Sequence, residues 1–178
     1  GVIINNEVLH GVNDAAAELG HMTVVIDGVK CGCGNRGCVE AYASVPGMVR
    51  RMKEAVEKGQ PSKLAARIKK GQEITGKDIH AAAVKGDAAA RAIIEETGMY
   101  LGIAAVNMMH IVNPAMVVFA GGMTAAGDML LNAIRAEVKK RALEASAAKT
   151  EILFARVGDD AGLIGSAGCA LRRLGISA

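Results

Sequence analysis

The spacing of apolar positions predicts a chain that begins with short strands, continues as helices and ends with strands and helices in alternation. Apolar residues at 2–4 and 8–10 flank Asn5-Asn6-Glu7 and predict a hairpin, because asparagine tolerates the positive φ of a tight turn. The β-branched run at 22–26 predicts a third strand. A glycine-rich loop is expected between that run and Cys38.

The middle of the chain has the periodicity of amphipathic helices. Thr75 and Asp78 have the spacing of a capping box and predict the start of one of these helices. Gly98 and Gly102 lie four residues apart and indicate close packing against a second helix. The expected helices cover about 45–58, 62–70, 76–85 and 88–111.

The last third alternates between the two kinds of element. Strands are expected over 115–120 and 151–157, with helices over about 128–144 and 159–174. Strands separated by helices are typical of a parallel sheet, so we predict an α/β region whose sheet is buried on both faces. Cys169 falls in an apolar helical stretch and is predicted to be a core residue.

The amino-acid composition and net charge exclude several classes of protein. The 178 residues are 51% apolar and 22% charged, which fits a folded domain. A net charge of +3 is too small to indicate a nucleic-acid partner. The apolar stretches are too short to span a membrane, and no secretory signal opens the sequence. Because residues 1–4 resemble the middle of a strand, we expect a piece of a longer protein.

His21, Cys31, Cys33 and Cys38 form the strongest chemical signal. Three thiolates and one imidazole at this spacing can surround a tetrahedral Zn²⁺ and leave no open position, which predicts a structural zinc site. A redox site or unligated thiols are the alternatives. A disulfide is less favoured, because three cysteines leave an odd thiol and Cys31 and Cys33 are too close to bridge comfortably.

Two carboxylates flank this cluster. Glu18 lies three residues before His21, and Glu40 lies two residues after Cys38. Carboxylates held on a rigid polar loop can accept hydrogen bonds from paired hydroxyls such as those of a sugar. Glu40 can equally begin a helix, where a negative charge favours the amino-terminal end. The residues alone leave both interpretations open.

The whole constellation resembles the ROK family of repressors and sugar kinases. Residues 18–21 and 31–40 match the paired ExGH and CxCGxxGCxE motifs of that family, and the pairing is highly specific. Residues 117–123 resemble the family's strand and Gly-Gly segment, and residues 161–167 resemble the start of its last helix. The resemblance covers essentially the whole chain and is closest to ROK glucokinases.

The resemblance implies an actin-like, ribonuclease-H-like ATPase fold of two lobes. This chain would supply the larger C-terminal lobe, and the N-terminal lobe would lie outside it. The lobe would comprise a zinc and sugar loop over 11–42, a helical segment over 45–112 and a nucleotide-side α/β segment over 115–178.

Roles for single residues follow from the same resemblance. His21, Cys31, Cys33 and Cys38 would hold the zinc, and Glu18, His21 and Glu40 would bind sugar hydroxyls. Gly1 would end a phosphate-binding loop, and Gly121 and Gly122 would lie against the adenosine part of a nucleotide, where absent side chains leave room.

The catalytic apparatus is expected to be incomplete. The phosphate motif of DxGxT type and the catalytic aspartate of an Asn-Asp pair precede the region matched here. Asn13-Asp14 imitates that pair but stands on the wrong side of the signature glycines. We therefore assign no catalytic residue in this chain and expect the chain alone to be inactive.

The leading function is a cytoplasmic glucokinase that uses ATP with Mg²⁺ to phosphorylate glucose, acting as a dimer or tetramer. A kinase for N-acetylglucosamine, N-acetylmannosamine or fructose is one alternative. A second is a sugar-sensing repressor, which would carry an upstream helix-turn-helix and bind DNA. A third is a zinc-stabilised domain without chemistry of its own.

Overall fold

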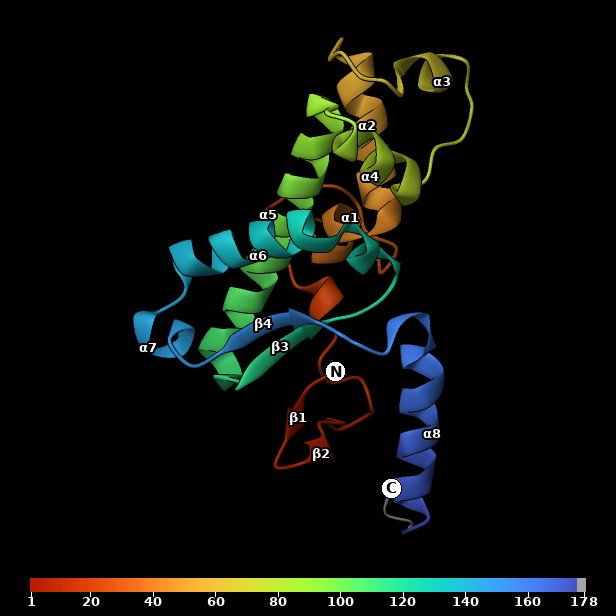
Figure 1. Ribbon diagram of the computed structural model, residues 1–178. Coiled ribbons are helices and arrows are strands. Elements are labelled where there is room, and N and C mark those ends of the chain that lie inside the picture. Colours follow the sequence, from red (N-terminus) through yellow and green to blue (C-terminus); the bar gives the residue numbers. More distant parts are fainter. Residues whose placement is uncertain (176–178) are drawn as a thin grey trace.

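A computed structural model describes residues 1–175, apart from the side chains of Asp159 and Arg172. Helices form the upper part of the molecule, with a two-stranded sheet below them and a hairpin at the amino terminus (Figure 1). The elements are β1 (Ile3–Ile4), β2 (Glu7–Val8), η1 (Leu19–His21), α1 (Val39–Ala43), α2 (Val45–Glu57), α3 (Ala65–Lys69), α4 (Gly76–Val84), α5 (Ala88–Val112), β3 (Met116–Phe119), η2 (Gly122–Ala126), α6 (Gly127–Arg141), α7 (Glu144–Ala147), β4 (Glu151–Phe154), η3 (Gly158–Asp160) and α8 (Ala161–Arg173).

The amino-terminal hairpin is confirmed, although its strands are short. β1 and β2 pair antiparallel, and Asn5 and Asn6 form the turn with φ values of 52° and 62°. The strand predicted over 22–26 is wrong. Only an isolated bridge between Thr23 and Cys38 occurs there, because the neighbouring backbone amides donate to a loop carbonyl and not to a partner strand.

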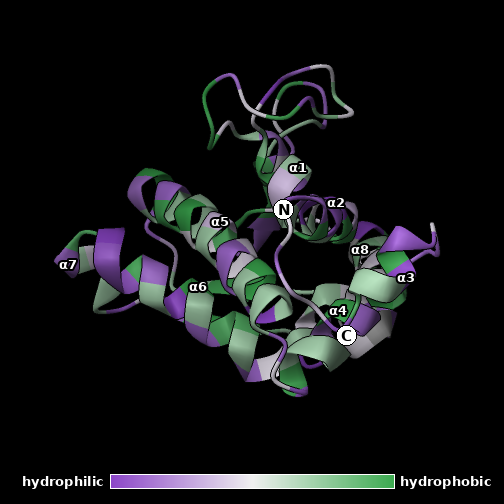
Figure 2. Cartoon of the chain, turned by 90° about the horizontal axis from the view of Figure 1, so that it is seen from above, coloured by the Kyte–Doolittle hydropathy of each residue, from purple (hydrophilic) through white to green (hydrophobic). Residues whose placement is uncertain are grey.

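Helix α5 is the centre of the molecule and packs against α1, α2, α4 and α6. Figure 2 shows α5 and α6 side by side. Gly98 and Gly102 make this approach close, as predicted. A methyl group added to Gly98 would overlap the Cβ of Ala133, and one added to Gly102 would lie 3.0 Å from the carbonyl oxygen of Ile134.

Arg51 of α2 joins three helices from inside the protein. Its guanidinium donates to the carbonyl oxygen of Tyr42 in α1 at 3.0 Å and to the hydroxyl of Thr97 in α5 at 2.5 Å. It also pairs with the carboxylate of Glu96 at 2.6 Å. A buried guanidinium is tolerated only when such partners replace water, so the network fixes α1 against α2 and α5.

Side-chain caps begin two of the middle helices, and the one at Thr75 was predicted from the sequence. The Thr75 hydroxyl accepts from the Asp78 amide while Asp78 accepts from the Thr75 amide, which is a complete capping box. Asp87 caps α5 by accepting from the Ala90 amide at 3.0 Å. The same carboxylate accepts from the Ser62 hydroxyl at 2.7 Å and thereby ties the α2–α3 connection to α5.

The parallel pairing of β3 and β4 confirms the α/β class, with Val117 opposite Ile152. The prediction that helices bury both faces of the sheet is wrong. Met116 and Val118 are 55% and 46% exposed, because α8 extends away from the sheet (Figure 1). For the same reason Cys169 of α8 is exposed and is not a core residue.

The predicted helix over 128–144 is divided into two. α6 ends at Arg141, and Ala142 takes an extended conformation before the short α7. In the part of the chain that the structure describes, no helix combines the length and apolar character needed to cross a membrane.

We predict that Gly98→Ala lowers the free energy of unfolding by about 1–3 kcal/mol, because the added methyl group forces α5 and α6 apart. Chemical denaturation measures the change. Gly165→Ala in α8 is the matched control, because a methyl group there meets nothing within 4 Å. Equal stability of the two variants would contradict the close packing of α5 on α6.

Candidate metal and sugar site

The loop that carries the cysteines is held by backbone hydrogen bonds in place of regular secondary structure. The amides of Val24 and Val25 donate to the carbonyl oxygen of Gly37, whose own amide donates to Val29. Gly37 has a φ of 76°, and any side chain there would overlap the Val25 carbonyl oxygen. Glycine is therefore required at this position for the loop to close.

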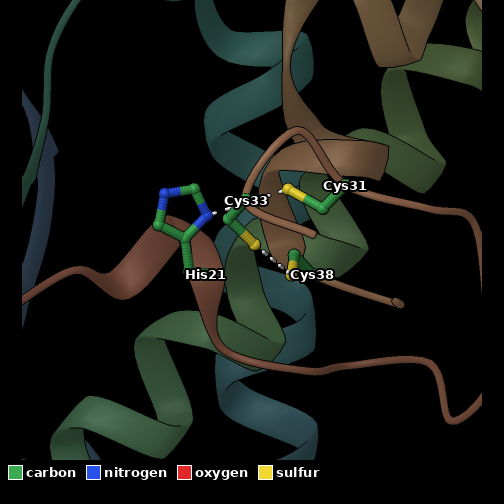
Figure 3. A group of neighbouring side chains, drawn as sticks. All are labelled: His21, Cys31, Cys33 and Cys38. Atoms are coloured by element: carbon green, nitrogen blue, oxygen red, sulfur yellow. Dashed lines mark hydrogen bonds between the residues drawn. The ribbon is translucent and has the colours of Figure 1, made fainter. Parts of the chain in front are cut away.

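His21, Cys31, Cys33 and Cys38 meet inside this loop (Figure 3). Their donor atoms all lie within 4.8 Å of one another. Cys31 Sγ is 3.7 Å from His21 Nδ1, and Cys33 Sγ is 3.7 Å from Cys38 Sγ. None of the four cysteines, all of which lie in the described part of the chain, forms a disulfide.

These separations fit a tetrahedral metal. Zinc–sulfur bonds of about 2.3 Å in a tetrahedron place two sulfurs about 3.8 Å apart. The residues also supply the donor set that zinc prefers, and four protein ligands leave no coordination position for water. The arrangement is therefore suited to holding a structural metal ion and not to activating a water molecule.

The surroundings shift the pKa values of three of the four side chains in the cluster. Burial, together with the neighbouring Cys33 thiol, raises the pKa of Cys38 to about 11. The backbone amide of Asn35 lowers the pKa of Cys33, and the hydrogen bond with Cys31 raises the pKa of His21. A metal must displace these protons to bind, so its affinity falls as the pH falls.

Glu18, His21 and Glu40 lie together beside the cluster. Glu18 Oε2 is 3.8 Å from His21 Nε2, on the side of the ring opposite Nδ1. The Glu40 carboxylate lies over Gly20, where an added methyl group would be 3.7 Å from its Oε2. Both carboxylates are exposed, and Glu40 stands in the first turn of α1. The helix-start and ligand-facing interpretations of Glu40 are therefore compatible.

The site is attached to the helices by an apolar contact that the sequence analysis did not predict. Met22, Val24, Val25 and Val29 pack against a small core made by α1 and α5. Tyr42 and Tyr100 form the centre of that core, with ring centroids 4.6 Å apart. The sequence offered one signal for this core: the chain has only two tyrosines, and one of them lies two residues after Glu40.

Gly121 and Gly122 line a cavity of about 300 Å³ at the carboxyl ends of β3 and β4. Phe119 and Phe154, the last residues of those strands, contribute to its walls together with residues of α1, α2 and α5. In open α/β sheets ligands bind at the carboxyl ends of parallel strands. The cavity is therefore placed where a small ligand is expected.

The predicted nucleotide-site residue Gly1 lies outside these groups, and so does Asp14, to which no role was assigned. Gly1 is exposed, and a methyl group added there would meet nothing within 4 Å. Asp14 is exposed and pairs with His10 at 3.0 Å, not with the metal cluster. A larger cavity of about 570 Å³ opens at the start of β4 between α6 and α7, and it contains none of the predicted site residues.

Comparison with known proteins places this chain in a family. The ROK family model matches residues 1–173, so the chain belongs to the ROK family. A glucokinase from Halalkalibacterium halodurans is 39% identical over 93% of this chain and 50% of its own length. A xylose repressor from Bacillus spizizenii is 32% identical over 93% of this chain and 39% of its own length.

Solved structures agree with the family. A ROK glucokinase from Streptomyces griseus, crystallised with glucose and AMPPNP, has a TM-score of 0.79 and 31% identity, covering 94% of this chain and 55% of that one. This chain thus spans about half or less of the length of these relatives. The relatives of this chain thus include both glucokinases and a xylose repressor.

Proposed function

We propose that this chain is the larger C-terminal lobe of an actin-like, two-lobed ROK glucokinase that transfers a phosphoryl group from ATP to glucose. The observation that carries the proposal is the position of Glu18, His21 and Glu40 beside a four-ligand cluster, in a chain 39% identical to a glucokinase. In this proposal the N-terminal lobe would supply the catalytic aspartate, and we expect no kinase activity from this chain alone.

In this proposal the metal cluster holds a structural zinc ion that shapes the sugar site. His21 would ligate the ion through Nδ1, because that atom faces Cys31, and its Nε2 is left for Glu18 or a sugar hydroxyl. The exposed carboxylates of Glu18 and Glu40 would accept hydrogen bonds from neighbouring hydroxyls of the sugar. Zinc supplies the fixed geometry of the loop and takes no part in phosphoryl transfer.

The nucleotide would bind with its adenosine part at Gly121 and Gly122. The cavity at the carboxyl ends of β3 and β4 supports this assignment. Gly1 would end the phosphate-binding loop supplied by the missing lobe. Mg²⁺ would arrive with ATP, since phosphoryl transfer needs a cation to neutralise the charge that develops on the phosphate oxygens.

A repressor is the second candidate, because xylose repressors and the regulator NagC of Escherichia coli are among the relatives. The same loop would then sense a sugar, and an upstream DNA-binding segment would deliver the response. The residues upstream of Gly1 distinguish the two functions. A phosphate motif of DxGxT type supports the kinase, and a helix-turn-helix supports the repressor.

We predict one zinc ion per chain and its loss in Cys31→Ser. Loss of the metal removes the bonds that join the four ligands, so Tm is expected to fall by about 5–10 °C, given about 2–4 °C for each kcal/mol in a chain of this size. Elemental analysis and thermal unfolding measure both effects. Cys169→Ser is the control, because Cys169 is exposed and outside the cluster. Full zinc content in Cys31→Ser would contradict the ligand assignment.

We predict that Glu18→Ala and Glu40→Ala each weaken sugar binding to the full-length protein by about 1–3 kcal/mol, because sugar hydroxyls lose their acceptors. Calorimetric titration with glucose measures the change, after zinc analysis has shown that the metal is retained. Glu57→Ala, which removes an exposed carboxylate at the end of α2, is the control. Glucose affinity equal to that of the control in both variants would remove the sugar-site assignment.

The proposed activity is tested by coupled measurement of ADP release from the full-length protein with Mg-ATP and a panel of sugars. Turnover is expected with glucose. Turnover with a different sugar, and none with glucose, would replace glucose as the proposed substrate and would still support a kinase. No turnover with any sugar, from folded protein that contains zinc, would contradict the kinase and favour the repressor, which DNA binding then tests.

A further inference from the structure

Tyr42 connects the metal-ligand loop to the helix that carries Glu40. It lies two residues after Glu40 in α1, and its hydroxyl accepts a hydrogen bond from the backbone amide of Val29 at 2.8 Å. Val29 precedes Cys31 by two residues, and Cys38 is the residue that caps α1. One hydroxyl therefore bridges the two ends of the loop that bears the cysteines.

The tyrosine ring is held so firmly that its hydroxyl has a defined position. The side chain is 7% exposed, and its ring is stacked at a tilt of 35° on Tyr100. The guanidinium of Arg50 lies over the ring at 5.7 Å from the centroid. The Tyr42 carbonyl oxygen also accepts from the buried Arg51 at 3.0 Å. Both ends of the residue are thus fixed to the helical body.

The loop passes directly over this hydroxyl. A methyl group added to Gly28 would overlap Tyr42 Oη and would also lie 3.0 Å from the Val25 side chain. The φ of Gly28 is not in the left-handed region, so lack of space and not backbone conformation favours glycine there. The absence of a side chain at Gly28 allows the Val29 amide to reach the phenol.

From this geometry we infer that Tyr42 is a positioning residue: its hydroxyl fixes the segment before Cys31 against α1, in register with Cys38 and Glu40. The inference rests on the proposed zinc site and adds the residue that couples that site to the sugar-facing carboxylate. A site of four ligands binds its metal ion less tightly when one ligand is free to move, because metal binding must then restrict the motion of that ligand. The hydrogen bond to Val29 removes that freedom before the metal binds.

The test is Tyr42→Phe in the full-length protein, which keeps the ring and removes only the hydroxyl. Because a single hydrogen bond is lost, zinc affinity is expected to fall about three- to tenfold in competition with a chelator. Exchange of the Val29 amide with deuterium should accelerate by at least the same factor. Tyr100→Phe is the matched control, since its hydroxyl contacts Glu96 at 3.4 Å and not the loop.

A second variant probes the same contact from the loop side. Gly28→Ala should weaken zinc binding, because the methyl group displaces the tyrosine hydroxyl. The effect should be smaller when Tyr42→Phe is already present, since the atom that the methyl group overlaps is then gone. Such non-additivity is the signature of two residues acting through one contact.

Three results would overturn the inference. Zinc affinity of Tyr42→Phe within twofold of Tyr100→Phe would show that the hydroxyl does not position the ligands. Strictly additive effects of Gly28→Ala and Tyr42→Phe would show that the two residues act separately. Absence of zinc from the wild-type protein would overturn the metal site itself, whereas the first two results leave the proposed kinase function intact.

Discussion

The placement of the candidate site depends on the burial of one arginine. A charged group taken out of water is stable only when nearly all of its donors find partners, and Arg51 finds them on two other helices. Its partners are Tyr42 in α1 and Glu96 and Thr97 in α5. Among the described residues, only its Nε is a buried side-chain nitrogen or oxygen without a partner. Loss of α5 would leave the buried charge without its carboxylate, and loss of α1 would leave a buried guanidinium donor without an acceptor, so the three helices keep one arrangement.

This constraint matters because α1 has only five residues and cannot hold a site by itself. It bears Glu40 near its start and Tyr42 one half-turn later, and Cys38 precedes it. The arginine fixes the helix from the inside, and the tyrosine extends that order outward into a loop with little secondary structure. A metal ion bound by the four ligands would further fix the loop in place beside α1.

The sequence predicted that His21, Cys31, Cys33 and Cys38 lie together, because the three cysteines are close along the chain. Three cysteines within eight residues leave few ways for the backbone to keep them apart, and the glycines between them permit tight turns. The start of α4 was equally predictable from a local signal, the capping box at Thr75. The helix predicted over 128–144 was not, because the structure divides it at Ala142. The strand predicted over 22–26 failed, because β-branched composition cannot supply the neighbouring strand that pairing requires.

What the sequence by itself determined is therefore local: the capping box of α4, the four side chains of the candidate metal site, and the glycines that permit α5 and α6 to touch. Tertiary structure alone decided which residues support that site. Arg51 is 9 residues from Tyr42 and 46 residues from Thr97, and Tyr42 is 13 residues from Val29. No spacing rule links these partners. The tertiary structure also decided that one face of the β3–β4 sheet is exposed, because the burial of that face depends on where α8 lies and not on the apolar pattern of the strands.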